Sequence, residues 1–65
     1  MNNRLELYYR WLTMRVWVRS MGHYYEVEAE HADGSSSIKL CYTRDDAVAY
    51  VDQLRKEGNR KECQF

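Results

Sequence analysis

The sequence predicts an α+β domain in which a three-stranded antiparallel meander packs on one C-terminal helix. Residues 13–19 and 23–31 alternate between apolar and polar side chains, as strands with one buried face do. An Asp-Gly pair at 33–34 is the strongest hairpin signal in the chain, and apolar residues at helical spacing follow from residue 43. These three observations together indicate a meander followed by a covering helix.

The chain of 65 residues has room for one domain, which we divide into an N-terminal segment 1–12, a sheet-plus-helix core 13–58 and a tail 59–65. Ten Lys and Arg balance ten Asp and Glu, and a hydrophobic share of 45% places the chain among folded proteins. No apolar stretch has the length of a signal peptide or a membrane span. Two cysteines are too few for a disulfide framework, so we expect a cytoplasmic protein, with one Cys41–Cys63 disulfide left open.

The first two strands present distinct faces. In 13–19 the side chains of Arg15, Trp17 and Arg19 alternate with those of Met14, Val16 and Val18. In 23–31 the outward residues are Tyr24, Glu26, Glu28 and Glu30, and the inward residues are Tyr25, Val27 and Ala29. A four-residue loop at 20–23 would place Arg19 opposite Tyr24, Trp17 opposite Glu26 and Arg15 opposite Glu28.

The Asp33-Gly34 pair predicts a two-residue turn, since these residue types accept the positive φ angles that such a turn requires. This turn sets the third strand's register. It places Ala29, Val27 and Tyr25 opposite Ile38, Leu40 and Tyr42 on the inner face, and Glu28 opposite Lys39 on the outer face.

The helix is predicted over 43–58, with Thr43 as its cap, two acidic residues in its first turn and Gly58 at its end. Its inward face is formed by Ala47, Val48, Tyr50, Val51 and Leu54. Asp52 and Lys56 are spaced to form an ion pair on the solvent side.

The two ends of the chain leave alternatives open. Residues 4–12 favour a helix capped by Asn3, and they fit a strand extension through Leu5, Leu7, Tyr9 and Trp11 almost as well. Residues 60–65 are a polar tail that adds a short strand or stays loose.

Metal and catalytic sites find little support in the sequence. His23, His31, Cys41 and Cys63 have none of the compact zinc spacings, and the expected register points His31 inward and Cys41 outward. Glu26 and Glu28 would lie about 7 Å apart on an open face, without the burial that raises a carboxyl pKa for acid catalysis. We therefore expect a non-enzymatic protein without a metal or another cofactor.

The outer sheet face is the predicted interaction surface, because Trp, Tyr, Arg and Met are the residue types enriched at interface centres. Trp17 and Tyr24 would be diagonal neighbours near the first turn. The alternative is that the N-terminal segment folds back over them as a second small core. The candidate binding residues are Arg15, Trp17, Arg19, Met21, Tyr24, Glu26 and Glu28.

The order of three strands and a helix that opens Thr43-Arg-Asp-Asp-Ala47 resembles the AP2 and integrase-arm domains over about residues 13–58. The resemblance implies that Arg15, Trp17, Arg19 and Lys39 lie where that family contacts the DNA major groove. This chain departs from the family at Glu26, Glu28 and Glu30, whose carboxylates repel phosphate.

In its small size and its lack of catalytic motifs, the chain also resembles small phage inhibitors, including anti-CRISPR proteins. We expect a protein-binding domain, a monomer or weak homodimer that inhibits a host protein away from the membrane, with nucleic-acid binding by the outer face as the alternative.

Overall fold

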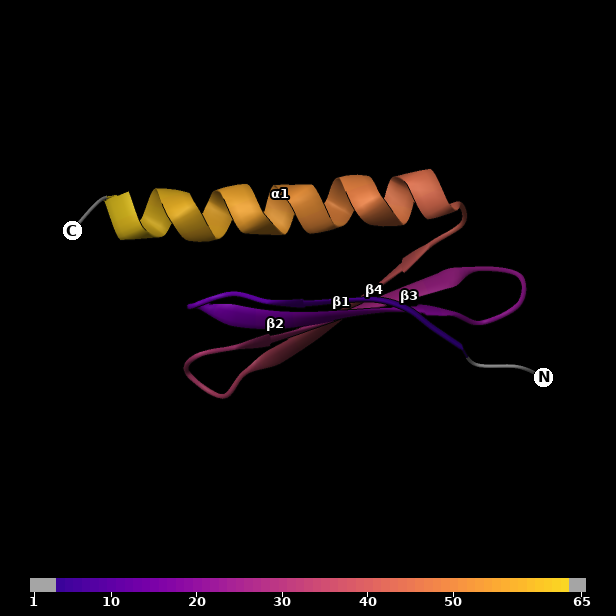
Figure 1. Cartoon of the computed structure of the whole chain (residues 1–65), viewed down its shortest axis with the longest axis horizontal. Helices are drawn as coiled ribbons and strands as arrows, with labels where there is room; N and C mark the ends of the chain where they lie inside the picture. The colour runs from indigo at the N-terminus through magenta and orange to yellow at the C-terminus, as the bar shows by residue number, and fades with distance from the viewer. Residues whose placement is uncertain (1–3, 64–65) are drawn as a thin grey trace.

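The computed structural model describes residues 4–63, and the side chains of residues 4–57. It contains the strands β1 (Arg4–Arg10), β2 (Met14–Ser20), β3 (Tyr25–His31) and β4 (Ser36–Cys41), followed by the helix α1 (Arg44–Cys63). All neighbouring strands are antiparallel, in the order β1-β2-β3-β4. Figure 1 shows α1 as a second layer along one side of this sheet. The α+β class is confirmed, and the sheet has one strand more than the sequence predicted.

The additional strand is the N-terminal segment, so its interpretation as a helix is wrong. Residues 4–10 are a strand, but this strand pairs antiparallel with β2 instead of extending it. A helix of nine residues is marginal on its own, whereas the edge of β2 offers backbone partners. Leu7, Tyr9 and Trp11 pack against the core. A register shift between Leu5 and Leu7 turns Leu5 to the opposite face, where it lies across from Arg19.

The first predicted turn joins β2 and β3, but it lies one residue later than expected. Ser20 pairs with Tyr25, and the Met21 N–H donates to the Tyr24 carbonyl over 2.9 Å. Gly22 supplies the positive φ of 101° that this turn requires. The β2–β3 register is therefore shifted by two residues, which preserves every face and changes every partner: Arg19 lies opposite Glu26, Trp17 opposite Glu28 and Arg15 opposite Glu30.

The hairpin between β3 and β4 contradicts the predicted register. The His31 N–H donates to the Ser35 carbonyl over 2.8 Å, and the Gly34 N–H donates to the His31 carbonyl over 3.0 Å, so the loop has three residues. A two-residue turn would need a positive φ at Asp33, and in the described residues only Gly22 and Gly34 have one. Asp33 instead accepts hydrogen bonds from the Ser35 N–H and hydroxyl, at 2.9 and 2.7 Å.

This slip of one residue turns each β4 side chain to the face opposite the predicted one. Val27 pairs with Lys39 rather than Leu40, Ala29 with Ser37 rather than Ile38, Tyr25 with Cys41 rather than Tyr42, and Glu28 with Ile38 rather than Lys39. As a consequence Cys41 is buried, whereas the side chains of Ile38, Leu40 and Tyr42 are exposed.

The core lies between α1 and the inner face of the sheet. Its buried residues are Met14, Val16, Val18, Val27, Ala29, Cys41, Ala47, Val51 and Leu54. The inward residues predicted for β2, β3 and α1 are confirmed as core or as partly buried residues beside it, except Val48, which is half-buried and does not belong to the core cluster.

The predicted helix cap is confirmed, because the Asp46 N–H donates to the Thr43 hydroxyl over 3.0 Å. Asp52 and Lys56 form the expected ion pair at 3.2 Å. The predicted end at Gly58 is wrong, since the backbone stays helical to Cys63 and includes residues 59–63 of the predicted tail. A glycine inside a helix weakens it without ending it. Residues 64–65 lie outside the described residues.

Candidate interaction surface

The outer face of the sheet, on the side away from α1, carries three rows of side chains that cross the strands. The register places Leu5, Arg19, Glu26 and Leu40 in the first row, Tyr8, Trp17, Glu28 and Ile38 in the second, and Arg10, Arg15, Glu30 and Ser36 in the third. Figure 1 shows no element of the described chain over this face. The residue types of this face therefore decide what the sheet can bind.

Trp17 lies in the second row, and its neighbour is Tyr8 rather than the predicted Tyr24. The rings of Tyr8 and Trp17 have centroids 5.5 Å apart and are tilted by 38°. Tyr24 lies in the β2–β3 turn, four residues from the Glu28 that faces Trp17, a separation of about 13 Å along a strand. The N-terminal segment thus lies beside β2 as the strand β1, where it covers Trp17 in part. It does not fold over the face of the sheet.

Arg19 connects the two central strands through carboxylates. Its Nη1 lies 2.8 Å from a Glu28 oxygen and 3.3 Å from a Glu26 oxygen. The three side chains are 22 to 31% exposed, so solvent screens these ion pairs only in part. Arg19 therefore bridges the two glutamates and offsets one of their two negative charges.

Apolar side chains lie on both flanks of this network. Leu5 is 54% and Tyr8 46% exposed on β1; Ile38 is 60% and Leu40 54% exposed on β4, and Tyr42 beyond it is 79% exposed. Sequence reasoning missed these residues, because the two-residue turn placed the β4 side chains in the core and β1 was interpreted as a helix. A three-residue loop that ends on a residue with positive φ is the next most common hairpin connection, so Gly34 as its third residue is the signal that could have identified the β4 flank.

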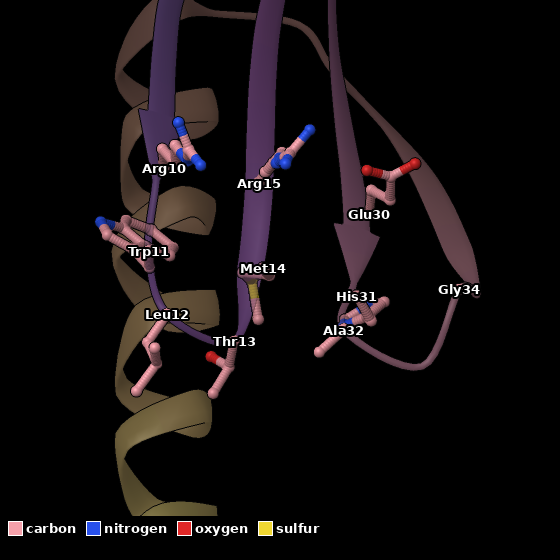
Figure 2. Close-up of a pocket in the computed structure, with 10 residues that line it drawn as sticks. All are labelled: Arg10, Trp11, Leu12, Thr13, Met14, Arg15, Glu30, His31, Ala32 and Gly34. Atoms are coloured by element: carbon pink, nitrogen blue, oxygen red, sulfur yellow. The ribbon is translucent and has the colours of Figure 1, made fainter.

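One end of the sheet is hollowed between the β1–β2 and β3–β4 turns, forming a cavity of about 670 Å³. Figure 2 shows Arg10, Arg15 and Glu30 in a row across three strands, with Trp11 and His31 nearer the turns. The two turns are joined by a hydrogen bond from the Ala32 N–H to the Thr13 carbonyl, 3.0 Å long. This end of the outer face has two adjacent arginines and is its most basic part.

The remaining candidate residues are divided between the face and its end. Arg15 is exposed in the third row, and Met21 and Tyr24 are half-buried in the β2–β3 turn. The structure thus brings Trp17, Arg19, Glu26 and Glu28 together, and it leaves Met21 and Tyr24 beyond the strands.

His31 and Cys41, two of the potential metal ligands, lie far apart in the structure. Cys41 faces the helix and is a buried free thiol, which contradicts the outward orientation predicted for it. It pairs with Tyr25 at one end of β3, and His31 lies at the other end, about 20 Å away along the strand. No group of three His, Cys, Asp or Glu side chains in the described residues is arranged to hold a metal ion.

No protein-family model, curated protein or solved structure matches this chain, so its functional interpretation depends on the surface itself. Within residues 4–63 no helix has the length and apolar character required to cross a lipid bilayer.

Proposed function

We propose that this chain is a non-enzymatic protein-binding domain and that it binds its partner with the outer face of the sheet. The observation that carries the proposal is the exposed apolar side chains on both flanks of an otherwise uncovered face. Leu5 and Tyr8 form one flank, and Ile38 and Leu40 form the other. Exposed apolar side chains that border polar residues on an uncovered face are typical of sites of protein association.

The centre of the face suits a protein partner because its glutamates are paired with Arg19. A row of unpaired carboxylates would be less suitable. Arg19 pairs with both Glu26 and Glu28, which leaves one net negative charge at the centre instead of two. Trp17 and Tyr8 provide a rigid aromatic pair beside this network, and aromatic residues dominate the energy of many interfaces. We infer that the aromatic pair anchors the partner and that the β4 flank extends the contact.

Nucleic-acid binding by the same face is the second candidate, and one observation favours it. Arg10 and Arg15 lie opposite each other at the hollowed end, and neither forms an ion pair among the described residues. Two observations disfavour nucleic-acid binding. Arg19 is paired with carboxylates, and Lys39 lies on the helix side of the sheet, whereas the resemblance to AP2 domains placed it on the outer face. Too few cations remain for a continuous phosphate track.

The likeness to small phage inhibitors, in small size and lack of catalytic motifs, supports a host protein as the partner. Inhibition would then follow from covering a functional surface of that host protein, without a chemical step.

Affinity capture with immobilised protein tests the proposal, using lysate with and without nuclease. Wild type is compared with Trp17→Ala and with the control Arg55→Ala on an exposed position of α1. We expect a captured protein that resists nuclease, is reduced at least tenfold by Trp17→Ala and is retained by Arg55→Ala. Truncation of a desolvated Trp often costs 2 kcal/mol or more, which is about a thirtyfold loss of affinity.

Loss of all captured protein on nuclease treatment, with duplex DNA binding that weakens steeply with salt and with Arg15→Ala, would favour the nucleic-acid function instead. Circular dichroism melts of each variant separate lost binding from lost folding.

A further inference from the structure

The backbone of β4 has a free edge, and the register identifies which of its groups are free. In an antiparallel pair, alternate residues exchange hydrogen bonds with the neighbouring strand. Because the His31 N–H bonds to the Ser35 carbonyl, the same alternation assigns Ser37, Lys39 and Cys41 to the bonds with β3. The N–H and C=O groups of Ile38 and Leu40 therefore point away from the sheet.

The two edges of the sheet differ in how well they are protected. A bulge between Leu5 and Leu7 interrupts β1, and charged residues stand at both of its ends. Bulges and charges are the usual devices that stop an edge from pairing with another chain. In contrast, β4 keeps an unbroken register over Ser36–Cys41, has no proline, and exposes all of its residues except Cys41. Its one charged residue, Lys39, lies on the helix side of the sheet. It is the edge that can accept another strand.

A groove of about 340 Å³ runs beside this edge, between β4 and α1. Its lining residues are Lys39, Leu40, Cys41, Tyr42, Asp46, Ala49, Tyr50 and Gln53. The small side chain of Ala49 is exposed there, and the Lys39 ammonium lies 5.5 Å from the centre of the Tyr50 ring. An edge strand with a groove between it and a helix has the layout required for strand addition, in which backbone bonds hold a peptide and the groove receives alternate side chains.

We propose that β4 binds an extended peptide segment of a partner protein as a fifth, antiparallel strand in this groove. Residues opposite Ile38 and Leu40 would lie on the outer face, beside two exposed apolar side chains, and they should be β-branched and apolar. The residue between them, opposite Lys39, points to the helix side.

Charge complementarity defines that central residue of the peptide. Lys39 forms no ion pair with a carboxylate among the described residues, so a Glu opposite it gains an attractive cross-strand contact. Asp46 already places one carboxylate on the groove wall, which disfavours further acidic residues. The expected segment is therefore apolar, acidic, apolar. The inference shares Ile38 and Leu40 with the surface of the proposed function, but it rests on the backbone edge and the groove rather than on the aromatic pair at Trp17.

The test uses fluorescence anisotropy of the labelled peptide Thr-Val-Glu-Val-Thr with purified protein. The matched control peptide is N-methylated at both valines, which removes the N–H groups that would bond to β4 and keeps every side chain. We expect saturable binding of the first peptide and at least tenfold weaker binding of the second. Equal binding of the two peptides, or no binding of either, overturns the proposal.

Substitutions in the protein supply the second arm. Ile38→Pro removes an N–H that the sheet does not use and should weaken binding at least tenfold, several-fold more than Ile38→Thr, which keeps the N–H. The wild-type protein should bind Thr-Val-Glu-Val-Thr more tightly than Thr-Val-Lys-Val-Thr. Lys39→Glu should reverse this preference, and the control Lys56→Glu on α1 should leave it unchanged. If β4 pairs with a second copy instead, sedimentation would show a dimer that Ile38→Pro dissociates, and the peptide proposal fails.

Discussion

Replacing Ile38 with Thr tests the β3–β4 register directly, because the two alternative turns place this side chain on opposite faces. Full burial of an isoleucine side chain stabilises a protein by about 1.5 to 3 kcal/mol. Ile38 keeps 60% of its surface exposed, so less than half of that stabilisation arises on folding. Threonine is also β-branched and suits a strand. We therefore expect Ile38→Thr to lower the free energy of unfolding by less than about 1 kcal/mol.

Val27→Thr is the matched variant on the other face. Val27 is 1% exposed, and a hydroxyl placed there without a partner costs about 1 to 3 kcal/mol. With the two-residue turn, Ile38 would lie under α1, and Ile38→Thr would then lose a methyl group and bury a hydroxyl, at a cost of about 2 to 4 kcal/mol.

Urea denaturation followed by Trp fluorescence and by circular dichroism measures both free energies, provided the two signals give coincident transitions. A loss for Ile38→Thr equal to or greater than that for Val27→Thr would refute the three-residue loop and with it the exposed β4 flank. A loss confined to Val27→Thr supports both.

Two further predictions concern local structure. The hydroxyl and N–H of Ser35 hold the pKa of Asp33 below its ordinary value of 3.8, so the stability that this carboxylate contributes is present above that value and is lost as the pH falls through the lower folded-state pKa. Urea midpoints measured from neutral to acid pH should therefore fall less steeply in Asp33→Asn than in wild type, and parallel curves would contradict this. Thr43→Ala removes the cap on α1 and should lower the free energy of unfolding by about 1 kcal/mol, whereas Thr43→Ser should keep most of it; equal losses would show that the hydroxyl contributes nothing.

The candidate surface was predicted in part. Trp17, Arg19, Glu26 and Glu28 share the outer face as expected, because a shift of two residues between β2 and β3 leaves alternation unchanged. Their contacts were not predicted, since partners depend on where the turn lies. Tyr8, the neighbour of Trp17, belongs to a segment whose helix and strand patterns are nearly equal in strength.

The sequence by itself determined the α+β class, the inward faces of β2, β3 and α1, and the cap of α1 at Thr43, because local periodicity and capping chemistry specify these features. Only the tertiary structure decided the rest. Residues 4–10 become a strand because β2 offers them hydrogen-bond partners, and β4 turns Ile38 and Leu40 outward because φ stays negative at Asp33 and positive at Gly34. One residue in a turn changes the face of an entire strand, so the apolar flank and the open edge depend on backbone conformation that composition does not specify.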